Sequence, residues 1–423
     1  MARSMKCPAA LAAAAVLALL AVLAAPSAAQ DFTVGTPTTP PAGAADASKF
    51  TTAEAVHTTT ITMEEMKNAR LQLTRQLTPE QAAALIEAAR APAPTDAPGV
   101  ESGASYAPFR GGAVPLSVGT GGWSFSDTRV GRSARNLAAY ARPAGKLYFQ
   151  IGTDWYICSA SLIGRSLLVT AAHCVCEFGQ STFFTNHIFI PDYDVDFPAT
   201  NVQFTAANMV VATSYYAGTD TCEPGAEGIV CSNDLALIWL NLNNGKQAFQ
   251  SANNLYYNYV VNGFEATTAP VDGFASVTVP KYLAITQLGY PADWDAAGKM
   301  QLSTSPGFPL NVAVNSNTMK NIVRGSSMTG GSSGGPWMLN WGVSATASNG
   351  VTYGTLNVRN AIVGVTSWGY INKDIKIQGA SAFAMNNEFP NAKYGIRGGG
   401  NIGAFVDYAC EWGWGLQALG YCR

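Results

Sequence analysis

Short apolar and aromatic runs fill the chain from about residue 146 onward, and they limit its fold more than any other feature. The runs are KLYFQI, DWYICSASLIG, SLLVTAAHCV, HIFIPDY, LALIWLNL, YLAITQLGY and NAIVGVTSWGY. Gly, Pro, Asn and Asp separate them, and no long helical pattern interrupts them. Runs of β-branched and aromatic residues between turn-forming residues are typical of strands. We therefore predict an all-β domain, either an antiparallel barrel or a sandwich, rather than a βαβ sheet.

The N-terminus has the pattern of a secretory signal peptide. Arg3 and Lys6 precede an apolar run at 9–25, and small residues at 27–29 offer a cleavage site before Gln30. A retained membrane anchor is the alternative, but the run ends in a proline and lacks a basic flank. We predict that residues 1–29 are removed and that the mature protein is secreted, with no membrane association after signal removal, in a compartment that permits disulfides.

Residues 30–122 differ in composition from the strand-rich part that follows. Residues 30–48 are mostly Thr, Pro, Ala and Gly, and we predict that they are disordered. Apolar residues at helical spacing come next, at Met63, Met66, Leu71, Leu73 and Leu77. A capping sequence at 78–81 starts a second predicted helix, before a Pro/Gly-rich stretch. We expect a partly helical prosegment or linker over 30–122, with a small accessory domain as the alternative, and the principal domain at 123–423.

Seven cysteines remain after removal of the signal peptide, and an odd number leaves at least one thiol unpaired or intermolecular. Cys158 and Cys174 lie 16 residues apart on two predicted strands, and a bridge between them would contribute roughly 3 kcal/mol by the loop-entropy argument. Cys222 could pair with Cys231 and Cys410 with Cys422, which would leave Cys176 as the odd thiol. The sequence alone does not decide this connectivity.

Two of the strand motifs carry polar residues that could act together. His173 lies in LVTAAHCV and is followed directly by Cys174; the alternative is a hydrogen-bonded histidine at the end of a buried strand. Asp234 opens the apolar strand SNDLALIWL; the alternative is an ordinary turn aspartate. A carboxylate in such apolar surroundings needs a hydrogen-bond donor, and an imidazole N–H is a suitable one.

GGSSGGPW, at 330–337, is a third motif and is too rich in glycine for a helix or an ordinary strand. A flexible linker is the alternative, but linkers rarely run straight into Pro, Trp and further apolar residues. A serine nucleophile needs a base to take its proton and fixed donors for the resulting oxyanion. We predict that Ser333 is the nucleophile and that the N–H groups of Gly331 and Ser333 form the oxyanion hole.

Together, in the order His, Asp, Ser, the three motifs resemble those of the chymotrypsin-like (trypsin-like) serine protease family. TAAHC, NDLAL and GSSGGP match the histidine, aspartate and nucleophile motifs of that family. The resemblance covers about residues 145–422. It implies two antiparallel six-stranded β-barrels with the active site in the cleft between them, and it implies that His173, Asp234 and Ser333 are the catalytic residues.

The resemblance also assigns substrate-binding positions. VGVTSWG at 363–369 resembles the strand along which a substrate backbone pairs, with Ser367, Trp368 and Gly369 in the key places. Ser327 stands where trypsin-like enzymes have an aspartate at the floor of the specificity pocket, and Met328 follows it. Neither residue is charged, nor is Thr366. We therefore expect a preference for an uncharged P1 residue, the residue whose carbonyl carbon is attacked.

The chain departs from the digestive enzymes at Ser332, where those enzymes carry an aspartate. This serine favours a resemblance to the glutamyl-endopeptidase-like branch of the family, as do GYP at 289–291 and MTGGSSGGP at 328–336. That branch often has a histidine where this chain has Thr366. Neither Arg/Lys nor Glu specificity therefore follows from the resemblance.

The predicted function is that of a secreted serine endopeptidase that hydrolyses peptide bonds through an acyl-enzyme intermediate. The alternative is a catalytically inactive protease-like binding protein. Protein or peptide substrates are the expected partners, and a net charge of −2 gives no reason to expect nucleic acid. No cofactor is expected and the sequence does not indicate an oligomeric state. Asp192, Asp194 and Asp196 in PDYDVDF could form a calcium loop, but they lack the glycine and distal glutamate of an EF-hand. We predict an exposed strand edge there instead.

Overall fold

Two β-barrels contain most of the strands in the computed structural model. The structure describes residues 40, 42–71, 124–130, 139–198, 201–224, 229–261, 283–342, 359–370 and 375–423. All of them belong to the unit Pro37–Arg423. The predicted signal peptide, the helix predicted to start near residue 78 and the Pro/Gly-rich stretch lie outside the described residues.

Six antiparallel strands form the first barrel. They are β4 (Ala144–Ile151), β5 (Asp154–Leu162), β6 (Leu167–Thr170), β7 (Thr185–Pro191), β8 (Phe204–Ala212) and β11 (Ala236–Leu240). Their order in the sheet is β8-β11-β6-β5-β4-β7, and β7 pairs back onto β8. Phe189 pairs with Phe204 at this closure. Full closure leaves these six strands without an unpaired edge.

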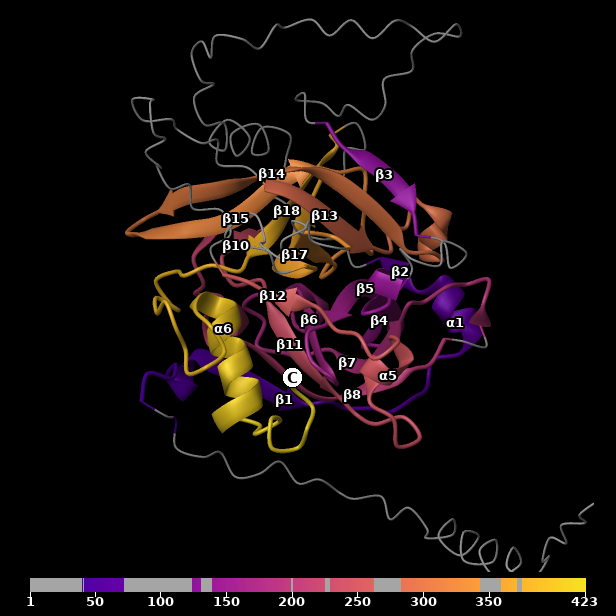
Figure 1. Ribbon diagram of the computed structural model, residues 1–423, viewed down its shortest axis with the longest axis horizontal. Helices are drawn as coiled ribbons and strands as arrows, with labels where there is room; N and C mark the ends of the chain where they lie inside the picture. Colours follow the sequence, from indigo (N-terminus) through magenta and orange to yellow (C-terminus); the bar gives the residue numbers. More distant parts are fainter. Residues whose placement is uncertain are drawn as a thin grey trace, which may run out of the picture. The chain divides into compact units, whose positions relative to one another are not determined.

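The second barrel has the same number of strands and also closes on itself. Its strands are β13 (Leu283–Gly289), β14 (Gln301–Val314), β15 (Asn317–Gly325), β16 (Pro336–Leu339), β17 (Ala361–Gly369) and β18 (Ile377–Ala382). Their order is β17-β16-β13-β14-β15-β18, and β17 pairs back onto β18. The predicted pair of antiparallel six-stranded barrels is therefore confirmed (Figure 1).

The strands near the junction of the barrels are buried along their whole length. Every residue of β6, β11 and β17 is buried. A barrel strand has one face in its own interior, so complete burial requires that its outer face is also covered. This explains why these segments read as continuous apolar runs rather than as alternating ones.

The described part of the predicted prosegment is packed onto the first barrel. It contains η1 (Ala47–Lys49), β1 (Phe50–Glu54), α1 (Met63–Asn68) and β2 (Arg70–Leu71). β1 adds to β8 as an antiparallel strand, and β2 adds to β5 as a parallel one. Thr62 and Glu65 form a capping box that starts α1. The helix predicted from Met63 is present but ends at Asn68, and Leu71 lies in β2; Leu73 and Leu77 are outside the described residues.

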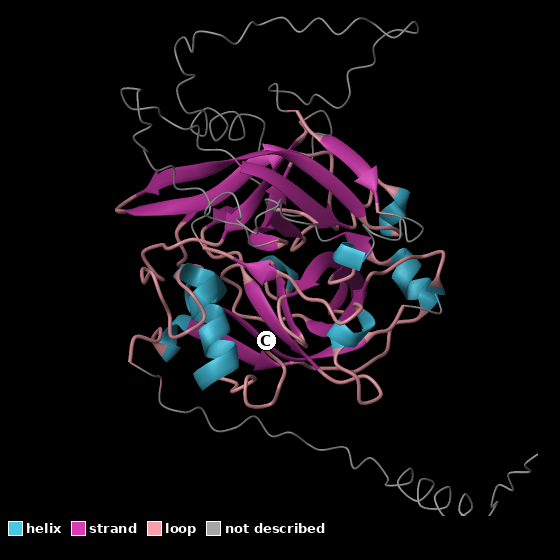
Figure 2. Cartoon of the chain, in the orientation of Figure 1, coloured by secondary structure: helices cyan, strands magenta, loops and turns pink. Residues whose placement is uncertain are grey.

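Short elements connect and cover the barrels, as Figure 2 shows. They are β3 (Ser126–Arg129), η2 (Ala172–Cys174), α4 (Thr213–Ala217), β9 (Cys222–Pro224), β10 (Ile229–Cys231), α5 (Ala248–Ser251), β12 (Asn258–Tyr259), η4 (Asp295–Ala297), α6 (Gly400–Asp407) and η5 (Tyr408–Trp412). α6 is buried at every residue. Among the described segments, no helix is long and apolar enough to cross a membrane.

Three disulfides join six of the seven described cysteines, in the arrangement that the spacing allowed. Cys158 is bonded to Cys174, Cys222 to Cys231 and Cys410 to Cys422. Cys176 is a free, buried thiol, and burial raises its pKa. The thiolate of Cys176 is therefore strongly disfavoured at neutral pH.

Candidate functional site

His173 lies on the 3-10 turn η2, which begins two residues after β6 ends at Thr170. Ala171 has an extended backbone, and its carbonyl accepts a hydrogen bond from the Cys174 amide at 3.1 Å. The disulfide from Cys174 to Cys158 ties this turn to β5. The imidazole is therefore carried on a turn that is covalently fixed to the barrel wall.

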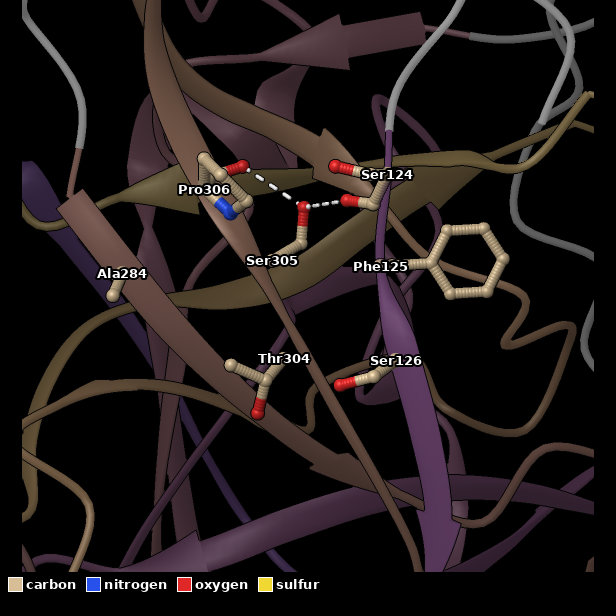
Figure 3. A pocket seen from close by; sticks show the side chains of 7 residues that line it. All are labelled: Ser124, Phe125, Ser126, Ala284, Thr304, Ser305 and Pro306. Carbon is tan, nitrogen blue, oxygen red and sulfur yellow. Dashed lines mark hydrogen bonds between the residues drawn. The ribbon is translucent and has the colours of Figure 1, made fainter. Parts of the chain in front are cut away.

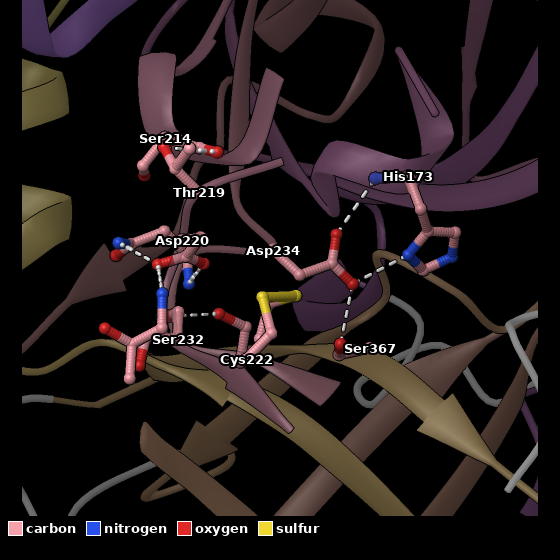
Figure 4. Close-up of a disulfide and its surroundings, with 12 residues drawn as sticks. His173, Ser214, Thr219, Asp220, Cys222, Ser232, Asp234 and Ser367 are labelled. Atoms are coloured by element: carbon pink, nitrogen blue, oxygen red, sulfur yellow. Dashed lines mark hydrogen bonds and ion pairs between the residues drawn. A yellow bond between two sulfur atoms is a disulfide. The ribbon is translucent and has the colours of Figure 1, made fainter. Parts of the chain in front are cut away.

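Asp234 precedes β11 and is bonded to three donors. The His173 amide donates to Oδ1 at 2.9 Å, and His173 Nδ1 lies 2.7 Å from Oδ2. Ser367, on β17 of the other barrel, donates its hydroxyl to Oδ2 at 2.6 Å (Figure 4). Burial alone would raise the pKa of Asp234, but His173 and Ser367 outweigh it, and the pKa lies below its usual value. The carboxylate is therefore ionised and points the imidazole in one direction.

The other two histidines lack a carboxylate partner among the described residues. His57 Nε2 lies 2.7 Å from the carbonyl oxygen of Ala206. His187 is fully buried, and its Nε2 lies 3.1 Å from the carbonyl oxygen of Cys174. Burial lowers the pKa of His187 to about 3, so its ring is neutral. Only His173 has the surroundings of a positioned base.

Two glycines of GGSSGGPW occupy positions that a larger residue could not. Gly331 has φ +93°, and a Cβ there would lie 2.5 Å from the carbonyl oxygen of Tyr290. Gly334 has φ +76°, and its Cβ would lie 2.0 Å from Thr170 Oγ1. Both dihedrals fall in the left-handed region that glycine tolerates. The segment is therefore a tight turn packed against the first barrel, not a linker.

Ser159, on β5, connects this turn to the first barrel. Its amide donates to the carbonyl oxygen of Ser333 at 2.7 Å, and its hydroxyl donates to the carbonyl oxygen of Gly331 at 2.8 Å. The same hydroxyl accepts from the Tyr290 amide at 3.0 Å. One residue therefore fixes both ends of the segment Gly331–Ser333 from the opposite barrel.

Two side-chain atoms at this junction are buried without a hydrogen bond. Neither His173 Nε2 nor Ser333 Oγ has a partner among the described residues, and both are shielded from solvent. The amides of Gly331 and Ser333 likewise donate to no described acceptor. Buried polar groups without partners are rare, and they need an explanation when they occur together.

The substrate-strand residues predicted from the sequence lie at the end of β17. Ser367 faces Asp234, as described above. The Trp368 indole is buried in the second barrel with Val230, Leu310, Met319 and Val323, and its Nε1 donates to Asn321 Oδ1 at 3.0 Å. Gly369 ends the strand opposite Gln378. The Thr366 hydroxyl lies in the barrel interior, where it accepts from Trp337 Nε1 at 2.9 Å.

The predicted pocket-floor residues are buried just after β15. The carbonyl of Met328 accepts from Gln378 Nε2 at 2.7 Å. The Ser327 hydroxyl donates to Asp127, 200 residues earlier in the chain. Sequence reasoning missed Asp127, Gln378 and Ser159. The proximity of Ser159 to Cys158 was a usable signal, but no local pattern could have placed Asp127 or Gln378.

The three aspartates of PDYDVDF do not form an exposed strand edge, so that prediction is wrong. β7 ends at Pro191, and the aspartates follow in a turn in which Asp194 is buried. Asp194 Oδ1 accepts from the Asp196 amide at 2.9 Å, and Asp196 pairs with Lys299. An aspartate that bonds the amide two residues on is typical of a turn.

In the part of the chain that the structure describes, two clusters have ligand atoms close enough together to hold a metal ion. One contains His173 with Cys158 and Cys174, and the other contains Asp220 with Cys222 and Cys231. The cysteines of both clusters are disulfide-bonded, and a disulfide sulfur is not the thiolate that binds metals. The donor sets therefore do not fit a metal centre.

Two closed antiparallel barrels, joined where a His–Asp pair meets a glycine-rich serine turn, define the chymotrypsin-like class. The family model described as Trypsin matches residues 136–387, more than half of the chain, and the chain belongs to this family of serine endopeptidases. No curated protein sequence matches the chain.

Solved structures with a related fold include three proteases. The thermostable serine protease AL20 from an extremophilic microorganism is 22% identical, with 58% of this chain and 93% of that chain covered and a TM-score of 0.42. Protease Anisep from Arthrobacter nicotinovorans is 21% identical, with 58% and 91% covered and a TM-score of 0.40. A Glu endopeptidase in complex with MPD is 18% identical, with 61% and 91% covered and a TM-score of 0.36.

Proposed function

We propose that the chain is the precursor of a secreted serine endopeptidase in which His173, Asp234 and Ser333 form the catalytic triad. The observation that carries this proposal is the two-point attachment of Asp234 to His173, at the backbone amide and at Nδ1. A carboxylate on Nδ1–H leaves Nε2 unprotonated, which is the tautomer that a base needs. Nε2 is also the imidazole atom without a partner.

The unpartnered groups have defined roles in this mechanism. Ser333 Oγ attacks the carbonyl carbon of the scissile peptide bond and gives its proton to His173 Nε2. The amides of Gly331 and Ser333 donate hydrogen bonds to the oxyanion that forms. When the tetrahedral intermediate collapses, the C–N bond breaks and His173 returns the proton to the leaving amine. A water molecule then attacks the acyl-enzyme by the same route, which releases the acid and regenerates Ser333.

Substrate binding is proposed at the end of β17. The backbone of a bound peptide would run beside residues 367–369, and the P1 side chain would point toward Ser327 and Met328. Ser367 belongs to this strand and also donates to Asp234. The strand that aligns the substrate is therefore bonded directly to the carboxylate that orients the base.

Export is proposed from the N-terminal sequence and from the cysteine chemistry. Three disulfides suit an oxidising compartment. We infer a signal peptide at 1–29 and a prosegment within 30–122. Residues 47–71 of that segment contribute two strands to the first barrel, which favours a role in folding.

A fluorophosphonate probe tests this proposal on the secreted protein after its own processing. We expect covalent labelling of Ser333, and loss of labelling in Ser333→Ala and His173→Ala. Ser332→Ala is the matched control and should still be labelled, because the Ser332 hydroxyl is engaged with the carbonyl oxygen of Thr329 at 2.7 Å. An unlabelled wild-type protein would favour the alternative, a protease-like binding protein.

A further inference from the structure

The strand β3 brings the chain just after the predicted prosegment against the second barrel. β3 pairs with the first residues of β14, from Ser126↔Thr304 to Arg129↔Gln301. Ser305 donates its hydroxyl to the carbonyl oxygen of Ser124 at 2.8 Å, across a groove of about 340 Å³ (Figure 3). A Cβ at Gly325 would lie 3.0 Å from the same Ser124 oxygen. β3 therefore packs tightly against the end of β15, just before the predicted pocket-floor residues.

This packing places a carboxylate on the predicted pocket floor. Asp127 Oδ2 accepts a hydrogen bond from the Ser327 hydroxyl. The other oxygen, Oδ1, is shielded from solvent and has no hydrogen-bond partner among the described residues. A buried carboxylate oxygen without a donor is costly, and a cation that supplies N–H groups removes this cost. The unsatisfied polar atom at the predicted pocket floor is therefore a hydrogen-bond acceptor.

Arg324, on which the charge of Asp127 acts, and Arg129, two residues further along β3, donate to other groups. Arg324 is fully buried and donates to the carbonyl oxygens of Gly325, Ile285 and Ser303 and to the Ser303 hydroxyl. Burial lowers its pKa to about 9, an effect that the charge of Asp127 opposes, so Arg324 stays protonated at neutral pH. Arg129 pairs with Asp295.

We propose that Asp127 determines P1 specificity: its carboxylate, delivered by β3 rather than by the pocket-floor position itself, binds the guanidinium or ammonium of a P1 Arg or Lys. The inference rests on the proposed function, because P1 is defined as the residue whose carbonyl carbon Ser333 attacks. It replaces the expectation of an uncharged P1 residue, which considered only Ser327, Met328 and Thr366. An acidic P1 residue would be repelled by the Asp127 carboxylate, and the donors of Arg324 are already bonded to other groups.

The first test measures kcat/KM on peptide amides that differ only at P1, with Arg, Lys, Leu and Glu. Active sites are first counted with an uncharged fluorophosphonate. We expect Arg and Lys to exceed Leu, and Glu to be the poorest. Asp127→Asn should reduce the ratio of Arg to Leu by about 10²-fold or more, as expected when one partner of a buried charge pair is neutralised. Asp127→Glu should keep the preference, because the charge remains.

The matched control is Asp154→Asn, which removes one carboxylate from the exposed start of β5, where it pairs with Arg70. It should leave the Arg-to-Leu ratio unchanged. A preference for Leu or Glu in the wild-type enzyme would overturn the proposal, as would a basic preference that survives Asp127→Asn.

A binding experiment separates this proposal from the proposed catalytic mechanism. Calorimetry of benzamidinium, a flat aromatic cation, with the Ser333→Ala protein requires no turnover. We expect binding that Asp127→Asn weakens by about 10²-fold or more. If benzamidinium binds but the wild type has no peptidase activity, the triad proposal is wrong and the cation site is still supported. If the Ser333→Ala protein binds benzamidinium equally well with and without Asp127→Asn, the cation-site proposal alone is wrong.

Discussion

Asp234 illustrates how much a single residue organises at this site, since its two oxygens serve His173 twice and Ser367 once. Replacing it with Asn would put an amide donor against Nδ1 and reverse the imidazole tautomer. We expect Asp234→Asn to lower kcat by ~10⁴, and Ser333→Ala or His173→Ala to lower it at least as much. The double Ser333/His173 change should be little worse than either alone. Near-additive losses in steady-state kinetics would mean that these residues do not act as a unit.

Ser159 is expected to act through Ser333 and Gly331 rather than on the substrate. Its hydroxyl bonds the Gly331 carbonyl and the Tyr290 amide. Ser159→Ala removes both bonds but keeps the amide that bonds Ser333, so the turn should loosen without collapsing. We expect kcat to fall by about 10-fold, the cost of about one buried hydrogen bond, with KM nearly unchanged. A rise in KM at constant kcat would assign Ser159 to substrate binding instead.

Lys146, in the first barrel, is expected to make the free energy of unfolding depend on pH. It is 2% exposed, donates to the Ala297 carbonyl at 2.9 Å and lies over the rings of Tyr148 and Tyr193. Burial lowers its pKa to about 7, below the unfolded value of about 10.4. Between these values the unfolded chain binds the extra proton, so stability from this group rises with pH, by at most about 1.4 kcal/mol per pH unit.

Lys146→Met tests that assignment. The free energy of unfolding in urea, measured from pH 7 to pH 10, should rise for the wild type relative to the variant. The variant should be the more stable protein at pH 7, because it buries no amine there. A difference that is constant across this range would show that the Lys146 proton is not linked to folding.

At the scale of elements, the strands with continuous apolar sequence were predictable and the others were not. KLYFQI became most of β4 and YLAITQLGY became β13. β14 and β15 gave no such signal, because buried and partly exposed residues alternate along β14 and polar residues begin β15. Their conformation depends on pairing with each other over Gly307↔Arg324 to Val314↔Asn317. Pairing between distant segments leaves no local pattern in the sequence.

The sequence did not predict the strand β1, for the same reason. This omission matters more, because β1 joins the N-terminal segment to the rest of the fold. Its sequence, FTTAE, is short and mostly polar, and it becomes a strand only by pairing with β8. Phe50 anchors it, since its ring lies 4.7 Å from that of Tyr408, 5.2 Å from that of Phe405 and 5.8 Å from that of Phe389. A segment predicted as a prosegment or linker, with a small accessory domain as the alternative, therefore shares an aromatic cluster with the C-terminal helical region.

Phe50→Ala tests the contribution of this element to stability. The side chain is 8% exposed, and we expect its truncation to lower the free energy of unfolding of the precursor by about 3 kcal/mol. Val56→Ala, at a position 55% exposed, is the control and should change it by less than about 0.5 kcal/mol. Equal urea midpoints for Phe50→Ala and the wild type would mean that β1 contributes little to the stability of the barrel.

At the scale of the whole molecule, the candidate site exists only where the two barrels meet. Asp234 and His173 belong to the first barrel, but Asp234 is bonded to Ser367 of the second. Ser333 belongs to the second barrel, but its carbonyl is bonded to Ser159 of the first. Each motif is local, so the sequence alone was enough to propose its chemical group. These cross-barrel bonds were not predictable, since each one joins segments that only the fold brings together.

The manner of activation follows from the bonds that support the serine turn. In digestive relatives an aspartate before the nucleophile pairs with a newly cut N-terminal amine. Here Ser332 Oγ donates to the Thr329 carbonyl at 2.7 Å and accepts from Gln378 Nε2 at 3.2 Å, so neutral partners already hold the turn. Gln378 also bonds the Met328 carbonyl, which ties the turn to β18. An ammonium would find no carboxylate at Ser332.

We therefore expect that no new N-terminal amine is needed for activity. Enzymes that begin at different residues between 112 and 123, all with β3 intact, should have the same kcat. Acetylation of their N-termini should leave kcat unchanged, because the partners of Ser332 lie within the second barrel. The comparison uses active sites counted by fluorophosphonate titration, so that differences in folding yield do not enter. Activity that appears only with one particular free N-terminal residue would show that an inserted amine orders the oxyanion hole after all.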